Sequence, residues 1–223
     1  MRWSLNLGRV AGIKILVHWT FLILIGWVVF TELSKGNDWN TIAITVLFVL
    51  AIFLCVVLHE LGHALMAKRF HIQTKKITLL PIGGVAALER MPAEPRKELL
   101  IAVAGPAVNV VIAVLLLPFV SAGDFQMTEE EALAITWDVF IPLLLVVNVM
   151  LVVFNAIPAF PMDGGRVLRA LLAFKMSRVK ATQIAASLGQ LLAIGFVVLA
   201  FFWGNPFLVF IGIFVFLGAY SEN

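Results

Sequence analysis

The feature that most constrains this chain is a long apolar run that ends in two histidines. Residues 41–66 read TIAITVLFVLAIFLCVVLHELGHALM, with no charged residue before Glu60. A run of roughly 18 or more apolar residues indicates a membrane-spanning helix, because about 20 residues cross the hydrocarbon core. Hydrophobic residues make up 62% of the chain and charged residues 13%. We therefore expect a polytopic α-helical membrane protein rather than a soluble domain.

The pattern His-Glu-x-x-His stands at the end of this run, as His59, Glu60 and His63. On a helix the two histidines lie one turn apart on the same face, where they can share one metal ion, usually zinc. Glu60 can then reach water beside the metal without being a ligand, as a metalloprotease requires. The competing interpretation is a helix with three polar groups and no function. It is disfavoured because such groups are costly at membrane depth.

We expect about six membrane-spanning helices, of which five lie outside residues 41–66. These five are predicted near residues 16–30, 99–120, 139–156, 184–203 and 206–219. Residues 1–15, which alternate polar and apolar positions, and residues 76–90, which contain glycines and a proline, predict short membrane-associated β-hairpins instead. The second hairpin either dips into the protein or lies at its surface. If it dips, its free edge near Gly83 and Gly84 could pair with an extended peptide.

A zinc ion held by two histidines needs a third protein ligand, and Asp163 is our candidate. Apart from Glu60, it is the only carboxylate in an apolar stretch that the expected topology places beside the histidines. It follows the proline-rich segment 155–162, NAIPAFPM, and precedes two glycines. The alternative is that Asp163 caps the helix that follows it.

The distribution of positive charge predicts the orientation in the membrane. With six spans and a cytoplasmic N-terminus, 15 of the 16 Lys and Arg residues fall in cytoplasmic segments, and only Lys35 falls outside. By the positive-inside rule, both termini and the histidine pair then lie near the cytoplasmic face. The net charge of +3 reflects this topology, and we expect the lipid bilayer, not nucleic acid, as a partner.

Asn109 is a further polar residue within an expected span. Two interpretations stay open, since its amide could hydrogen-bond the backbone of a substrate or hold two helices together.

Three ordered motifs resemble the site-2 protease family of intramembrane zinc metalloproteases in its bacterial and archaeal form. They are His59-Glu60-Leu61-Gly62-His63, residues 105–109 (GPAVN) and residues 155–165 (NAIPAFPMDGG). The resemblance implies zinc bound by His59, His63 and Asp163, Glu60 as general acid and base, and Asn109 and Asn155 near the substrate.

The resemblance also implies a substrate and a setting. The substrate would be a single-pass membrane protein, such as an anti-sigma factor or a membrane-tethered transcription factor, cut within or near its transmembrane segment in the cytoplasmic membrane. A transporter that uses the same histidines and carboxylates for a metal or other ion is the main alternative, and an inactive relative that retains zinc is another. The sequence does not indicate an oligomeric state.

The domain organisation follows from the same comparison of motifs. Residues 1–223 correspond to a single transmembrane metalloprotease core. Many relatives carry CBS domains after the core or a PDZ domain within it, and no insertion here is long enough for a PDZ domain. Either this is a minimal member of the family or a regulatory domain following residue 223 is missing from this sequence, and we favour the second interpretation.

Overall fold

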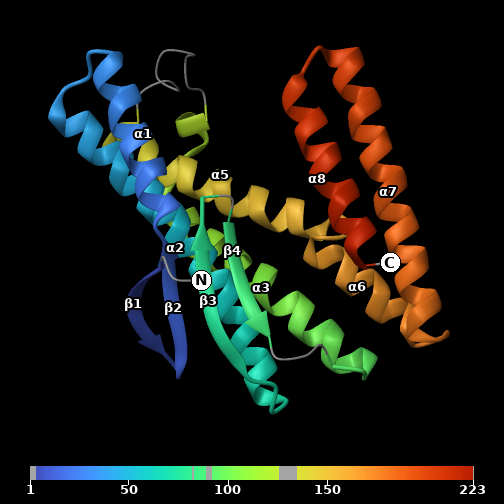
Figure 1. Ribbon diagram of the computed structural model, residues 1–223. Helices are drawn as coiled ribbons and strands as arrows, with labels where there is room; N and C mark the ends of the chain where they lie inside the picture. Colours follow the sequence, from blue (N-terminus) through green and yellow to red (C-terminus); the bar gives the residue numbers. More distant parts are fainter. Residues whose placement is uncertain (1–3, 82, 89–91, 126–134, 223) are drawn as a thin grey trace. The chain divides into compact units, whose positions relative to one another are not determined.

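The computed structural model describes residues 4–81, 83–88, 92–125 and 135–222. The chain divides into two compact units (Figure 1). The first comprises residues 1–90 and 107–151, and the second comprises residues 91–106 and 152–223. Helices α3 (Pro95–Leu116) and α5 (Trp137–Ala156) each contribute residues to both units.

The first unit contains one small sheet and the histidine-bearing helix. Its elements are β1 (Ser4–Val10), β2 (Ile13–His18), α1 (Thr20–Ser34), α2 (Trp39–Arg69), β3 (Thr74–Leu80) and β4 (Gly83–Leu88), followed by parts of α3 and α5 and the short turns η1 (Leu117–Phe119) and η2 (Ala122–Phe125). Both expected hairpins are present. The second begins at residue 74 rather than 76, and residues 82, 89 and 90 lie outside the described part.

The two hairpins join into one four-stranded sheet with the order β1-β2-β3-β4. Strands β1 and β2 are antiparallel, as are β3 and β4, whereas β2 and β3 pair in parallel. The β1–β2 turn is formed by Ala11 and Gly12, which both have positive φ, as a tight two-residue hairpin turn requires. The parallel pair is possible because α1 and α2 form the crossover between its strands.

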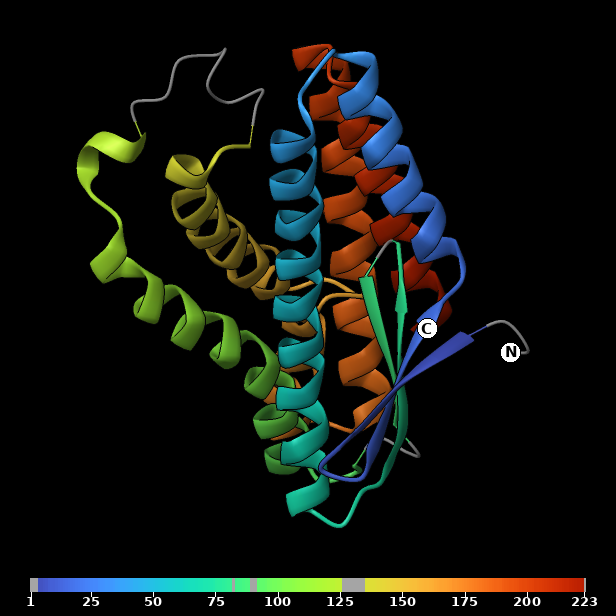
Figure 2. The ribbon, with the colours of Figure 1, turned by 90° about the vertical axis from the view of Figure 1, so that its left-hand side faces the viewer.

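One face of the sheet packs against α2, as Figure 2 shows for β3 and β4. In β2, alternate side chains are buried, and they meet Val57 and Leu61 of α2. Ile77 and Leu79 of β3 complete this core and are 0% and 4% exposed. The second hairpin therefore lies against the protein, which agrees with the first of its two sequence-based interpretations.

Helix α2 begins at a capped end and continues for 31 residues. The carboxylate of Asp38 accepts a hydrogen bond from the backbone N–H of Thr41 at 3.0 Å, which satisfies one of the free donors of the first turn. Lys68 and Arg69 occupy the last turn, where positive charge is favourable. His59 lies ten residues before the helix end, or about 15 Å along the axis.

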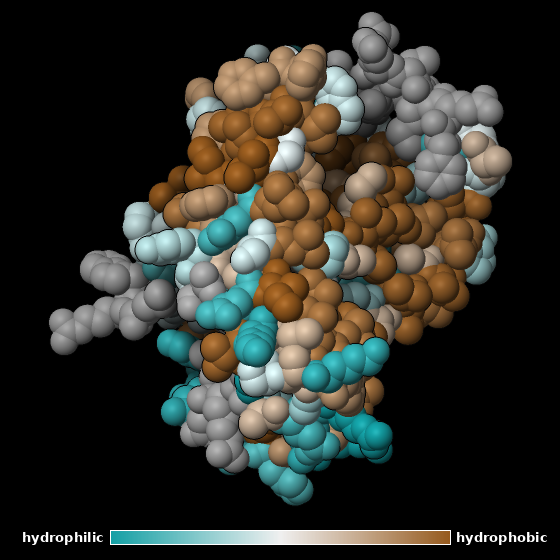
Figure 3. Space-filling view, turned by 90° about the vertical axis from the view of Figure 1, so that its right-hand side faces the viewer, coloured by the Kyte–Doolittle hydropathy of each residue, from teal (hydrophilic) through white to brown (hydrophobic). Residues whose placement is uncertain are grey.

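The second unit is built around a helical hairpin. Its elements are α6 (Asp163–Ala173), α7 (Arg178–Trp203) and α8 (Pro206–Glu222), together with the first part of α3 and the end of α5. Small residues let α7 and α8 approach closely, and a Cβ added at Gly189 would lie 3.0 Å from Cβ of Ala219. Figure 3 shows that hydrophobic side chains cover most of the upper part of the face on which these helices lie, whereas hydrophilic ones lie at its lower end and also partway up it.

Four helices among the described residues are long and apolar enough to cross a membrane. They are α2, α3 with its η1 extension, α5 and α7. The expected first and last spans correspond to α1 and α8, which are apolar but have only 15 and 17 residues. Residues 166–180 are basic and amphipathic, which predicts a surface segment. They form most of α6 and the start of α7, and Arg169 is buried rather than exposed.

Candidate metal centre

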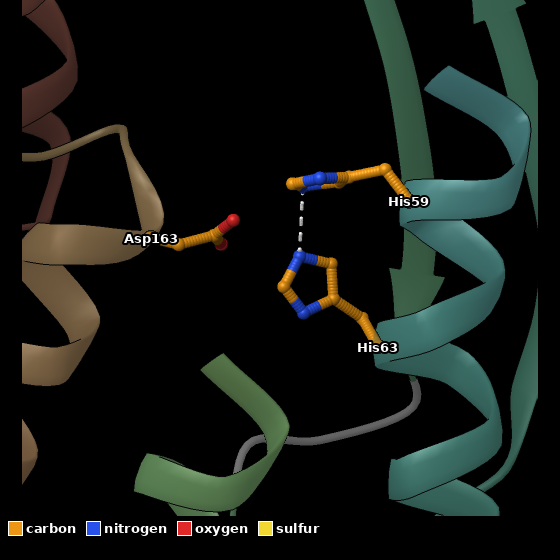
Figure 4. A group of neighbouring side chains, drawn as sticks. All are labelled: His59, His63 and Asp163. Carbon is orange, nitrogen blue, oxygen red and sulfur yellow. Dashed lines mark hydrogen bonds between the residues drawn. The ribbon is translucent and has the colours of Figure 1, made fainter. Parts of the chain in front are cut away.

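His59 and His63 lie on one face of α2 and are 6% and 3% exposed. Their rings point toward each other, with 3.1 Å between the two Nε2 atoms (Figure 4). The helical spacing of four residues produces this arrangement, because it stacks the two side chains one turn apart.

The separation of the two nitrogens provides a test of whether the pair fits a metal ion. Two imidazole nitrogens bound to one zinc at about 2.0–2.1 Å with a tetrahedral angle would be about 3.3 Å apart. The observed 3.1 Å is close to this value. The pair therefore converges on a common point, as two ligands of one ion do.

The other nitrogen of His59 has its own partner. Nδ1 lies 2.5 Å from Oδ1 of Asn109 on α3. The amide nitrogen of Asn109 donates to Oδ1 of Asn148 on α5 at 2.9 Å. Both asparagines are fully buried. Asn109 thus contacts the histidine directly and also joins two helices, whereas Asn148 was not recognised as a site residue from the sequence.

Glu60 follows His59 on α2 and is half-buried. Strand β4 passes close to it at Gly84, where an added Cβ would lie 2.8 Å from Cγ of Glu60 and 3.2 Å from Cγ1 of Val56. Gly84 therefore leaves the room that the Glu60 side chain occupies. Gly83 precedes it in β4 and is paired with Leu80 of β3.

Asp163 is the first residue of α6 in the second unit and is 6% exposed. The N-cap residue is Met162, so Asp163 does not occupy the capping position that the alternative interpretation gave it. Nη1 of Arg166 lies 3.8 Å from its Oδ1. His59, His63 and Asp163 each offer a ligand atom for a metal ion.

The two glycines after Asp163 let the start of α6 pack on the preceding segment. A Cβ at Gly164 would lie 2.2 Å from the carbonyl oxygen of Ile157, and one at Gly165 would lie 2.6 Å from the backbone nitrogen of Phe160. Asn155 lines a cavity of about 330 Å³ in this unit, together with Asp163, Pro106 and Pro158. The cavity lining is otherwise mostly apolar.

The fold and the histidine pair define a class of protein. A buried His-Glu-x-x-His pair whose nitrogens converge, on a helix apolar enough to span a membrane, is the metal centre of a membrane metalloprotease. The model of peptidase family M50 matches residues 47–123 and 120–196. The chain belongs to this family.

A curated protein and a solved structure support this assignment. Zinc metalloprotease MJ0392 of Methanocaldococcus jannaschii is 41% identical over 223 residues, which is 100% of this chain and 61% of that protein. The solved structure of the site-2 protease from the same organism is similar with a TM-score of 0.67 and 35% identity, covering 99% of this chain and 95% of that one. The donor set of two imidazoles and one carboxylate suits zinc.

Proposed function

We propose that this protein is an intramembrane zinc metalloprotease that hydrolyses a peptide bond within or near the transmembrane segment of a membrane-anchored regulatory protein. The observation that carries the proposal is the buried convergence of His59 and His63 beside Glu60, on a helix of membrane-spanning length. Buried ionisable groups at membrane depth are retained for function, because their desolvation is costly.

In this proposal His59, His63 and Asp163 hold the zinc ion. When bound, zinc supplies a Lewis acid that polarises the scissile carbonyl and makes water acidic enough to attack near neutral pH. Glu60 takes the proton from the attacking water and passes it to the departing amine. Glu60 follows His59 on α2 and is half-buried beside β4, so in this proposal it reaches water at the metal without being a ligand.

We propose that β4 binds the substrate as an added strand. A helical substrate must unwind before it is cut, because its own hydrogen bonds and side chains shield its carbonyls. Strand β4 is at an edge of the sheet, so its outer backbone groups can replace the hydrogen bonds that the substrate loses. Gly83 and Gly84 begin this strand, and Gly84 brings it next to Glu60.

Asn155 and Asn109 were both predicted to lie near the substrate. For Asn155 we retain this role, since it lines the same cavity as Asp163 and its amide could hold a backbone group of the peptide. For Asn109 the observed hydrogen bonds to His59 and Asn148 support a role in positioning His59 instead.

The substrate class follows from the site and from the likeness to the site-2 protease of M. jannaschii. We propose a single-pass membrane protein such as an anti-sigma factor or a membrane-tethered transcription factor. We also propose six spans in the cytoplasmic membrane, with residues 1–223 as the protease core and both ends of this core and the active site toward the cytoplasm.

The test combines metal content and cleavage in detergent-purified protein. We expect about one zinc per chain in the wild type, with a sharp loss in His59→Ala and Asp163→Ala. Glu60→Gln should keep zinc and lose at least roughly a hundredfold in the cleavage of fluorescent single-pass membrane peptides, as expected for an essential proton carrier. Removal of zinc with a chelator should abolish cleavage, and added zinc should restore it.

Two outcomes would contradict the proposal. Zinc retained in full by Asp163→Ala would remove this residue from the ligand set. Cleavage by Glu60→Gln at the wild-type rate would exclude the assigned proton transfer. Absence of cleavage by zinc-loaded wild-type protein would favour ion transport instead.

A further inference from the structure

We propose that Asn148 and Asn109 form a relay that fixes which ring nitrogen of His59 carries hydrogen, so that Nε2 is left to bind the metal. This inference rests on the proposed metal site and deepens it. It assigns Asn109 to positioning of a ligand, in place of the substrate contact that the family resemblance implied, and it gives a role to Asn148.

The relay starts from a backbone carbonyl. The side-chain nitrogen of Asn148 donates to the carbonyl oxygen of Leu144, one turn earlier on α5, at 2.8 Å. A carbonyl oxygen only accepts hydrogen bonds, so the Asn148 atom beside it must be the NH₂ group. The same nitrogen lies 3.4 Å from Sγ of Cys55, which also accepts. The orientation of the Asn148 amide is thereby determined, although nitrogen and oxygen of an amide are similar in shape.

Each later step follows from the one before. Because the Asn148 nitrogen faces Leu144, its Oδ1 faces Asn109, and only the NH₂ group of Asn109 can meet it, at 2.9 Å. Oδ1 of Asn109 then faces His59, where it can only accept. Nδ1 of His59 must therefore carry the hydrogen of this bond.

The consequence appears at the opposite side of the imidazole ring. A neutral imidazole has one N–H and one lone pair, so hydrogen on Nδ1 leaves the lone pair on Nε2. This is the atom that lies 3.1 Å from Nε2 of His63. Partners of this kind orient a ligating histidine and raise its affinity for metal.

Burial makes the relay strict. Asn109 and Asn148 are 0% exposed and His59 is 6% exposed, so water does not compete for these groups. The three residues come from three different helices, α3, α5 and α2, all in the first unit. A structural role in joining these helices predicts a loss of stability upon mutation, whereas the relay also predicts a loss of metal affinity.

The experiment measures the zinc dissociation constant by competition with a chromophoric chelator. Asn148→Leu keeps the branched shape of the side chain but has no polar group, so the Asn109 amide loses its fixed orientation. We expect a roughly ten- to hundredfold rise in the zinc dissociation constant.

Thr45→Val is the matched control. Like Asn148, Thr45 is a buried polar residue, but it lies on α2. Its hydroxyl donates to the carbonyl oxygen of Thr41 at 3.0 Å, more than three helical turns before His59. Its loss should lower the unfolding temperature without changing zinc affinity. If Asn148→Leu behaves in the same way as this control, the relay is wrong and the asparagines only join helices.

A second measurement does not depend on how the variants fold. Nitrogen NMR of metal-free, ¹⁵N-histidine-labelled wild-type protein should show His59 with hydrogen on Nδ1, and hydrogen on Nε2 would overturn the proposal. The metal site itself is tested separately. Wild-type protein without zinc affinity would contradict the proposed function, whereas normal wild-type binding with an unaffected Asn148→Leu would contradict the relay alone.

Discussion

At the scale of single residues, strand β4 contacts the proposed catalytic carboxylate through Gly84, whose backbone lies against the side chain of Glu60. A methyl group at residue 84 would overlap Cγ of Glu60, an atom in the middle of the side chain that cannot move without moving the carboxylate. The site thus depends on a residue that has no side chain to contribute.

Gly84→Ala should lower the rate of peptide cleavage by roughly tenfold or more, because a small displacement of a catalytic group is costly. Zinc content should stay at the wild-type level, since neither histidine is touched. The measurement is single-turnover cleavage together with metal analysis on the same preparation.

The control for this substitution is Gly195→Ala in α7. An added Cβ there would meet nothing within 4 Å, and alanine favours a helix over glycine. Cleavage should therefore be unchanged. Equal activity of Gly84→Ala and the wild type would show that Glu60 does not need this space.

The sequence identifies the candidate site residues that follow local rules. His59, Glu60 and His63 are identified by spacing on one helix, and Asp163 by its apolar setting and its topology. Asn148 is also a polar residue in an apolar span, and the same reasoning applied to it would have flagged it. Its partners could not be predicted, because Cys55, Asn109 and Asn148 meet only through helix packing.

At the scale of elements, α6 is anchored by a buried ion-pair network in the second unit. Nη2 of Arg169 lies 2.7 Å from Oε1 of Glu98 on α3, and its Nη1 donates to Oε2 of Glu222 at the end of α8 at 2.9 Å. The guanidinium also lies over the ring of Phe160, 4.9 Å from the centroid. These contacts hold the helix that begins with Asp163.

Arg169→Met should destabilise the protein by about 3–5 kcal/mol, because it leaves the buried Glu98 carboxylate largely uncompensated. Among the described residues, the only other cationic partner of Glu98 is Arg178, whose Nη2 lies 3.5 Å from Oε2 of Glu98. For a chain of this size the loss corresponds to a fall of roughly 6–20 °C in the unfolding temperature. Thermal unfolding in detergent provides the measurement.

Lys97→Met is the comparison for a surface pair. Lys97 and Glu94 lie 2.7 Å apart but are 42% and 53% exposed, so their loss should cost less than about 1 kcal/mol. The double variant Glu98→Gln/Arg169→Met should recover part of the stability that Arg169→Met loses. A drop as small as that of Lys97→Met would mean that the network contributes little.

Local sequence patterns predict the two hairpins but not the way in which they join into one sheet. Alternation in residues 1–15 and the glycines and proline in residues 76–90 predicted two hairpins, because turns are encoded locally. The parallel pairing of β2 with β3 joins Lys14 to Lys76 across the whole of α1 and α2. No short-range pattern encodes such a pair, so the single sheet could not be predicted. Likewise, the basic, amphipathic sequence around Arg169 is typical of a surface helix. Its guanidinium nevertheless pairs with Glu98 on α3 and Glu222 on α8.

At the scale of the whole molecule, α1 is too short to cross a bilayer as a free helix. Its 15 residues extend about 22 Å, against a hydrocarbon core of about 30 Å. The parallel β2–β3 pair resolves this difficulty, because β2 precedes α1 and β3 follows α2. Since β2 and β3 lie side by side, α1 starts at the sheet and α2 returns to it. The two helices therefore cross the bilayer in opposite directions, and the buried residues of β2 lengthen the segment that crosses with α1.

Helix α8 is explained by its partner in the same way. It runs back along α7 from the Gly204-Asn205 turn, and its last residues return to Arg169, which precedes α7 in the chain. The 17 residues of α8 therefore bring residue 222 to the side on which α7 begins. Helices α1 and α8 thus each pair with a longer helix that crosses in the opposite direction. For this reason we propose six spans, although only four of the described helices satisfy the length criterion.

Cysteine labelling tests this topology. In a Cys55→Ala background, single cysteines at the exposed positions Ser34, Ser177 and Ser221 would be treated with a membrane-impermeant maleimide. With six spans and the positive-inside orientation, Ser34→Cys reacts in intact spheroplasts, whereas Ser177→Cys and Ser221→Cys react only after permeabilisation. If α8 does not cross, Ser221→Cys reacts from outside together with Ser34→Cys. That result would reduce the spans in the second unit by one and place the C-terminal end of this core across the membrane from Ser177.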